Sequence, residues 1–221
     1  MKIKYSILIS LFITISSCCG KTNDNNLGKQ SKQSFIQRNE AETTEQFAER
    51  LKPENSKISH KVISAQWNSL PVIIAFYDQT YKLSKNQDPD QTNYHRIIAT
   101  LFVENQKNNY NKVIINTFDT DGGSPKIETI LFANADKDVS KELITIVSWE
   151  LSSQEVSGTI YKTFIYDDLL KNKSDKPVFL KEISTKLDGG CECSFSDGRN
   201  KKAKLKTAKD IKVELLKLGY K

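Results

Sequence analysis

Six runs of apolar and β-branched residues alternate with short polar segments through the middle of the chain. Such runs favour β-strands, and polar turns as short as 119–125 suit antiparallel hairpins rather than helical crossovers. The run 142–149 is apolar on both faces, so we expect it to lie centrally in a sheet and to be covered on both sides. The six predicted strands span residues 70–83, 94–104, 112–118, 126–133, 142–149 and 158–166.

Helix signals flank this β-rich middle. Thr43 stands three residues before Gln46, which is the spacing of a capping box and predicts a short helix. Apolar residues recur at helical spacing after Pro177 and again after Thr207, and between them residues 191–206 have the pattern of a hairpin with an Asp-Gly turn. The chain is therefore expected to be α+β: an antiparallel β-meander sheet with a short N-terminal helix and two C-terminal helices flanking a hairpin.

The N-terminus has the pattern of a secretory signal. Lys2 and Lys4 are followed by thirteen apolar or small residues, a run shorter than the roughly 20 residues of a membrane span. Its end, "ISSC", resembles the bacterial lipobox, and this resemblance implies that Cys18 is acylated and becomes the first residue of the mature chain. Cys19 is a weaker alternative, because a serine would then stand at the aliphatic position. An ordinary signal peptide is the remaining interpretation.

The expected organisation is a lipoprotein signal peptide at 1–17, a flexible tether at 18–42 and one globular α+β domain at 43–221. The tether is polar and almost free of apolar residues, so it has little surface to bury. By the sorting rule of bacterial lipoproteins, an Asp after the lipidated cysteine retains the protein in the inner membrane, and Cys19 stands there instead. This implies a palmitate-type anchor in the cell envelope, at the outer membrane.

The net charge of +6 is concentrated at the C-terminus, where residues 199–221 carry nine basic side chains against Asp210 and Glu214. Nucleic acid is not an expected partner of a secreted chain. Anionic lipid headgroups or lipopolysaccharide would suit this segment if it binds anything, and a solvated basic face is the alternative.

One acidic loop has the spacing of a metal site. Asn134, Asp136, Asp138 and Glu142 occupy loop positions 1, 3, 5 and 9, from which alternate side-chain oxygens can converge on one ion, as calcium requires. The stretch 134–143 resembles the calcium loop of FG-GAP (integrin-type) repeats, with Val139 where that family has a glycine. The resemblance implies a calcium ligand set at these four residues. A polar turn between two strands is the alternative.

Strand direction decides which acids can join this loop. If successive strands alternate in direction, their turns alternate between two ends of the sheet, about 25 Å apart. One end then holds Asp119, Asp121, Glu150 and Glu155, and the other holds Asp136, Asp138, Asp167 and Asp168. Asp119 cannot reach Asp136, whereas Asp167 or Asp168 is a candidate to complete a metal site.

Signatures of catalysis are missing from the sequence, which has no nucleophile elbow, phosphate loop, zinc-protease motif or dinucleotide fingerprint. Of the two histidines, His95 opens a strand at the predicted Asp119 end, where it forms either a His–Asp pair or a surface position. Cys191 and Cys193 would face the same side of a strand, which suits a structural disulfide or inert thiols, with a redox site or half of a soft-metal site as alternatives. No residue is assigned a catalytic role.

Several stretches of the mature domain are similar to lipoproteins of Bacteroidetes: "PKIETILFANADKD", "KELITIVSW" with "GTIYKTFIYDD", and "KTAKDIKVELLKLGY". The resemblance implies a lineage and a compartment but no activity. The leading hypothesis is a non-enzymatic, lipid-anchored binding or structural protein with an envelope protein or a glycan as partner, for instance an immunity protein. A calcium-stabilised binding module and an envelope redox or hydrolytic enzyme are the alternatives.

Overall fold

The computed structural model describes residues 35–169 and 176–220. The predicted signal peptide, Cys18 and Cys19 lie outside these residues. Residues 33–221 belong to one compact unit. Among the described residues, no helix combines the length and the apolar character that crossing a membrane would need.

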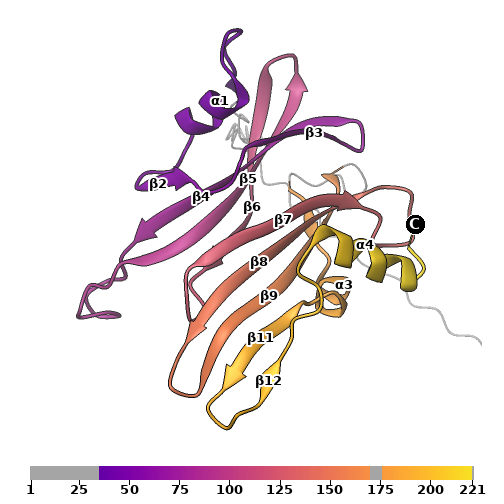
Figure 1. Cartoon of the computed structure of the whole chain (residues 1–221). Coiled ribbons are helices and arrows are strands. Elements are labelled where there is room, and N and C mark those ends of the chain that lie inside the picture. The colour runs from indigo at the N-terminus through magenta and orange to yellow at the C-terminus, as the bar shows by residue number, and fades with distance from the viewer. Residues whose placement is uncertain (1–34, 170–175, 221) are drawn as a thin grey trace, which may run out of the picture. The chain divides into compact units, whose positions relative to one another are not determined.

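The first half of the chain forms a six-stranded antiparallel sheet, here called sheet A (Figure 1). Its long strands are β4, β5 and β6, which form a meander in chain order. Short strands extend both edges, because β1 pairs with β6 while β2 and β3 both pair with β4. The bounds are β1 Ile36–Gln37, β2 Ser56–Ile58, β3 Ile63–Trp67, β4 Leu70–Tyr81, β5 Tyr94–Gln106 and β6 Asn109–Asp119.

The second half forms sheet B, also six-stranded and antiparallel. The order is β12-β11-β9-β8-β7, and β10 pairs with the last residues of β9. As expected, the apolar strand β8 lies between two neighbours and is buried along its first eight residues. The bounds are β7 Pro125–Ala133, β8 Glu142–Ser152, β9 Val156–Asp167, β10 Val178–Phe179, β11 Gly190–Phe195 and β12 Asn200–Lys201.

Three helices lie among the described residues: α1 (Thr44–Arg50), α3 (Lys181–Lys186) and α4 (Ala208–Lys217). The predicted capping box is present at α1, where Thr43 and Gln46 exchange side-chain hydrogen bonds with each other's main chain. The same exchange between Thr207 and Asp210 begins α4. These caps satisfy N–H groups that the first helical turn leaves without partners.

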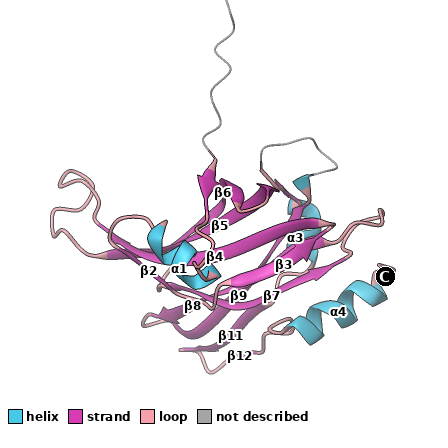
Figure 2. Cartoon of the chain, turned by 90° about the horizontal axis from the view of Figure 1, so that it is seen from above, coloured by secondary structure: helices cyan, strands magenta, loops and turns pink. Residues whose placement is uncertain are grey.

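The elements pack around three apolar clusters of described residues, and Figure 2 shows the sheets and helices from above. One apolar cluster fills the space between the two sheets and includes Leu101 of β5 and Val147 of β8. A second lies between the outer face of sheet A and Phe47 of α1. The third lies between the outer face of sheet B and helices α3 and α4, where Ile183 and Ile211 pack. The α+β class predicted from the sequence is confirmed, and the expected meander is divided into two packed sheets between β6 and β7.

Of the segment expected to be a tether, residues 18–42, the structure describes residues 35–42. Ile36 packs on the cluster beneath α1, and β1 pairs with Tyr110 and Asn109 of β6. Glu42 accepts hydrogen bonds from the Arg50 guanidinium at 2.7 and 2.8 Å. In this otherwise polar stretch, the apolar side chain of Ile36 and the ion pair between Glu42 and Arg50 together hold the chain against the sheet.

Candidate metal centre

The loop between β7 and β8, residues 134–141, is shaped by its own side chains. Asp136 accepts the Asp138 main-chain N–H at 2.8 Å, and Asp138 accepts that of Ser140 at 2.7 Å. The Asn134 side-chain amide donates to the Asp138 carbonyl. Such Asx turns let short polar side chains replace main-chain turn hydrogen bonds. The polar alternation seen in the sequence therefore has a direct local role in bending the chain.

Three carboxylates converge where this loop meets the end of β9. Asp136 comes from the loop, Glu142 is the first residue of β8, and Asp167 is the last residue of β9. One ligand oxygen from each lies within 4.8 Å of those of the other two. Antiparallel pairing explains the meeting, because Leu143 is opposite Tyr166, so the start of β8 adjoins the end of β9.

Glu142 is the centre of the cluster and is completely buried. Its Oε2 accepts the main-chain N–H of Ala135, while its Oε1 has no hydrogen-bond partner among the described residues. The Asn134 Oδ1 is likewise buried and unpartnered. The pKa of Glu142 is raised to about 7: burial is the largest cause, the negative charges of Asp136, Asp138 and Asp167 act in the same direction, and the hydrogen bond from the Ala135 N–H opposes them. A buried carboxylate oxygen without a partner is costly unless something else satisfies it.

A turn of sheet A holds this loop from the other side. Asn68 and Ser69 join β3 to β4 with φ values of 47° and 71°, the left-handed conformation of a tight hairpin turn in which Asn is favoured. The Asn68 amide donates to the Lys141 carbonyl at 2.9 Å and to Asp168 Oδ2 at 2.7 Å, and its oxygen accepts the Lys141 N–H at 2.9 Å. The main-chain N–H and the carbonyl of Lys141, the residue preceding Glu142, are therefore both held by hydrogen bonds to Asn68.

The donor set and its spacing suit calcium. Calcium binds oxygen ligands at about 2.3–2.6 Å, so two oxygens on opposite sides of one ion lie at most about 5 Å apart. The ligand oxygens of Asp136, Glu142 and Asp167 lie within 4.8 Å of one another, which fits that limit. Magnesium usually keeps several waters and binds only one or two carboxylates, so a set of three carboxylates is more typical of calcium. The cluster contains no His or Cys, the ligands that zinc and copper favour.

Of the four ligands predicted from the sequence, the structure brings Asp136 and Glu142 together and adds Asp167 from the end of β9. The side-chain oxygen of Asn134, in the same loop, is buried and has no hydrogen-bond partner among the described residues. The side chain of Asp138 accepts the Ser140 N–H. Val139, at the position of the family's glycine, is 99% exposed. Sequence reasoning missed Asn68 because the short strand β3 and its two-residue turn were not predicted.

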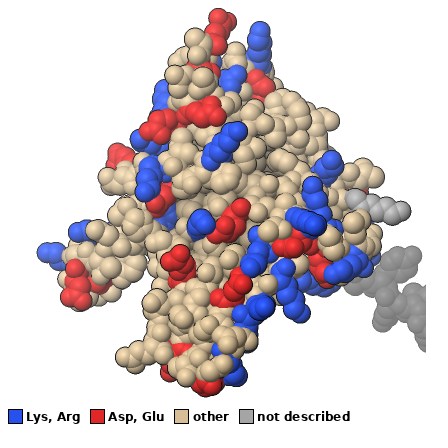
Figure 3. Space-filling model, in the orientation of Figure 1, with Lys and Arg blue, Asp and Glu red and all other residues tan. Residues whose placement is uncertain are grey.

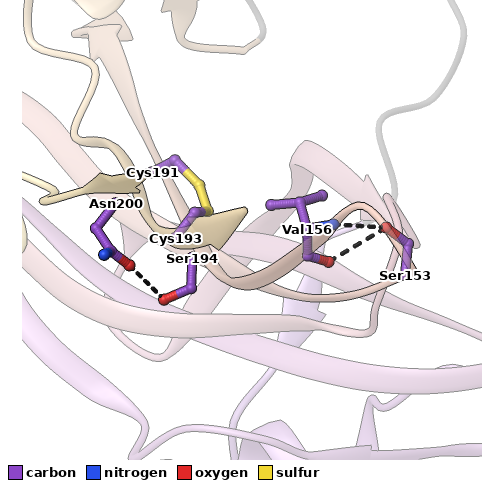
Figure 4. Close-up of a disulfide and its surroundings, with 6 residues drawn as sticks. All are labelled: Ser153, Val156, Cys191, Cys193, Ser194 and Asn200. Carbon is purple, nitrogen blue, oxygen red and sulfur yellow. Dashed lines mark hydrogen bonds between the residues drawn. A yellow bond between two sulfur atoms is a disulfide. The ribbon is translucent and has the colours of Figure 1, made fainter. Parts of the chain in front are cut away.

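The cysteine pair lies elsewhere, on β11 (Figure 4). Cys191 and Cys193 form a disulfide with their Cα atoms 5.4 Å apart. Cys193 is buried and Cys191 is half-buried. Opposite Cys193 on β9 is Gly158, with φ at +142°, where an added Cβ would lie 2.1 Å from the Glu192 carbonyl oxygen. The close approach of β9 and β11 here requires glycine.

The other titratable group considered from the sequence is His95. Its Nδ1 lies 3.0 Å from Asp78 Oδ1. Its main-chain N–H donates to the Thr120 hydroxyl, and that hydroxyl donates to the His95 carbonyl. Asp119 instead accepts the Tyr81 hydroxyl at 3.4 Å. The side-chain partner of His95 is therefore Asp78 and not Asp119, because the strand pairing places His95 diagonally across from Asp78 on the same face of sheet A.

No protein-family model matches the chain, and no curated protein and no solved structure matches it either.

Proposed function

We propose that the protein is a calcium-stabilised, non-enzymatic binding module of the cell envelope, with Asp136, Glu142 and Asp167 as calcium ligands and Asn134 supplying a further oxygen. The observation that carries the proposal is the wholly buried Glu142, whose unpartnered Oε1 belongs to a cluster of three carboxylates. A cation satisfies that oxygen and also offsets the repulsion among the acids.

The position of the ion supports a structural role for it. Glu142 and Asp167 are buried, and their neighbours are held by the β3–β4 turn of the other sheet. An ion here joins the 134–141 loop, the end of β9 and, through Lys141, sheet A. The consequence is a rigid loop surface suited to binding a partner.

Calcium titration of residues 33–221 tests the proposal, by calorimetry and by thermal unfolding. A ligand at about 100 times its Kd adds about 2.7 kcal/mol to the free energy of unfolding. At about 2–4 °C per kcal/mol for a domain of this size, the melting temperature is expected to rise by about 5–10 °C. Magnesium at the same concentration should give a smaller rise.

The matched variants are Asp136→Asn and Asp90→Asn. Each removes one charge, but Asp90 is an exposed residue between β4 and β5, outside the cluster. Asp136→Asn should lose most of the calcium-induced rise, and Asp90→Asn should keep it. A parent protein whose melting temperature does not respond to calcium would refute the proposed site.

The envelope location is proposed from the lipobox at Cys18. In cells that process lipoproteins, Cys18→Ser should abolish incorporation of labelled palmitate into the full chain, whereas Cys19→Ser should leave it unchanged. Labelling that survives Cys18→Ser but not Cys19→Ser would place the anchor at Cys19. A parent chain that incorporates no label would refute the proposed anchor.

A further inference from the structure

Three concavities surround Tyr220, just beyond the end of α4. Their volumes are about 300, 410 and 390 Å³, and Tyr220 lines all three. Their other walls come from the 133–141 region, from β10 and α3, and from the C-terminal half of α4. We call this surface the Tyr220 face. It includes the exposed side of the proposed metal loop.

Basic side chains line the Tyr220 face. None of them forms an ion pair within the described part of the chain. Figure 3 shows Lys and Arg side chains gathering over α4 and the elements beside it, with acidic side chains between them. The lysines that line the concavities are Lys137, Lys141, Lys181, Lys186 and Lys212.

Exposed apolar side chains line these concavities or adjoin their lining residues in the chain. Val139 follows the lining residue Asp138 and is 99% exposed, and Leu216 of α4, which lines one concavity, is 64% exposed. Phe179 of β10 and Leu218 are each 43% exposed and line two of the concavities. Exposed apolar groups beside unpaired lysines are the combination that binds the interface of a lipid layer.

Val139 distinguishes a lipid layer from a folded protein as the partner. Its side chain is 99% exposed, so almost none of it is covered by the rest of the described chain. A protein partner would need a matching pocket for such a side chain, whereas mobile acyl chains accommodate it without one. The lysines then meet the negative charge of the headgroups, where each contributes about fivefold in affinity.

Calcium would change the charge of this face. Asp136 and Asp138 flank Lys137 in the chain. A bound calcium adds two positive charges at this point and holds the loop that carries Val139.

We propose that the Tyr220 face docks on a membrane surface rich in anionic phospholipid, with Val139 inserted and calcium strengthening the attachment. The role of calcium rests on the proposed function, while the lysines and exposed apolar groups do not depend on it.

Sedimentation with vesicles tests the proposal. Residues 33–221 contain all three apolar clusters in one compact unit, and therefore fold without the residues before them. The probes are vesicles of phosphatidylcholine alone and vesicles containing a third phosphatidylglycerol, each in calcium and in chelator. Binding is expected to the anionic vesicles in calcium, to be several-fold weaker in chelator, and to fall with added salt.

Matched variants test whether vesicle binding depends on the Tyr220 face or only on the net positive charge of the protein. Lys181→Gln with Lys186→Gln should weaken anionic-vesicle binding about 25-fold, while Lys85→Gln with Lys107→Gln, both exposed on turns of sheet A, should not. Val139→Ser should weaken it about tenfold. Ile114→Ser, which also alters an exposed residue, should leave it unchanged.

Two results would overturn the proposal. One is equal sedimentation with neutral and anionic vesicles, or with neither. The other is tight binding of labelled poly-L-glutamate that is insensitive to Val139→Ser, without vesicle binding, which would assign the face to an acidic protein. If calorimetry shows calcium binding but the vesicles do not sediment the protein, the lipid inference fails while the metal site stands. If anionic vesicles bind and calorimetry shows no calcium, the metal site fails instead.

Discussion

Trp67 donates its indole N–H to the main-chain carbonyl of Lys141 at 2.5 Å, which joins the last residue of β3 to the residue preceding Glu142. The two residues are 74 positions apart; Trp67 belongs to sheet A, and Lys141 lies in the loop that precedes β8 of sheet B. With the Asn68 side chain bonded to the same carbonyl, this contact couples sheet A to the proposed metal loop.

The fluorescence of Trp67 should therefore report calcium binding. The protein has two tryptophans. The indole N–H of Trp149 donates to the carbonyl of Asp119, the last residue of β6, near the end of β8 that is farther from the 134–141 loop. A calcium titration is expected to change the emission of the parent and of Trp149→Phe, and to leave that of Trp67→Phe nearly constant. A change that survives in Trp67→Phe and disappears in Trp149→Phe would contradict the coupling.

Asn68→Gly should weaken calcium binding without unfolding the protein. Glycine keeps the left-handed φ of 47° but removes the hydrogen bonds to Lys141 and Asp168. Residues that hold metal ligands in place typically contribute 10–100-fold in affinity, so the calorimetric Kd should rise by at least about tenfold. Asn108→Gly is the control, because Asn108 also has a left-handed φ, of 62°, on the β5–β6 turn. Equal affinities of the two variants would show that Asn68 does not position the loop.

The Cys191–Cys193 disulfide should stabilise the fold only modestly. It joins residues two positions apart, and the chain-entropy relation gives about 1–2 kcal/mol for so short a loop. The double variant Cys191→Ser, Cys193→Ser is expected to lose that amount in urea unfolding, and the parent in reductant should unfold at the same midpoint. Thiol titration of native residues 33–221 should find no free thiol without reductant. Two free thiols would contradict the disulfide.

Acid should weaken the attachment of the N-terminal segment. The Arg50 hydrogen bonds, with the Asn39 main-chain N–H and the charges of Arg50 and Arg38, lower the pKa of Glu42 from 4.5 to about 2. Because the pKa is lower in the folded protein, the stability from this pair is present above pH 4.5 and is lost as the pH falls through about 2. Glu42→Gln should be less stable than the parent at neutral pH, with the difference vanishing in acid. Glu40→Gln, at an exposed neighbour, should match the parent throughout.

The sequence alone determined the local elements of this protein. Runs of apolar and β-branched residues located β4 to β9, and capping residues located the starts of α1 and α4, because each signal is carried by neighbours in the chain. The spacing of Asp136 and Glu142 indicated an oxygen-ligand loop for the same reason. Alternation of strand direction made Asp167 or Asp168 a candidate to join it, and the structure brings Asp167 there.

Only the tertiary structure decided how these elements combine. A run such as 142–149 shows that both faces of a strand are buried, but not which surfaces cover them. Here they are sheet A on one side and α3 with α4 on the other. Asn68, Trp67 and Tyr220 reach the loop from distant parts of the chain through packing of apolar faces. No local pattern records such contacts, so the loop could be predicted and its surroundings could not.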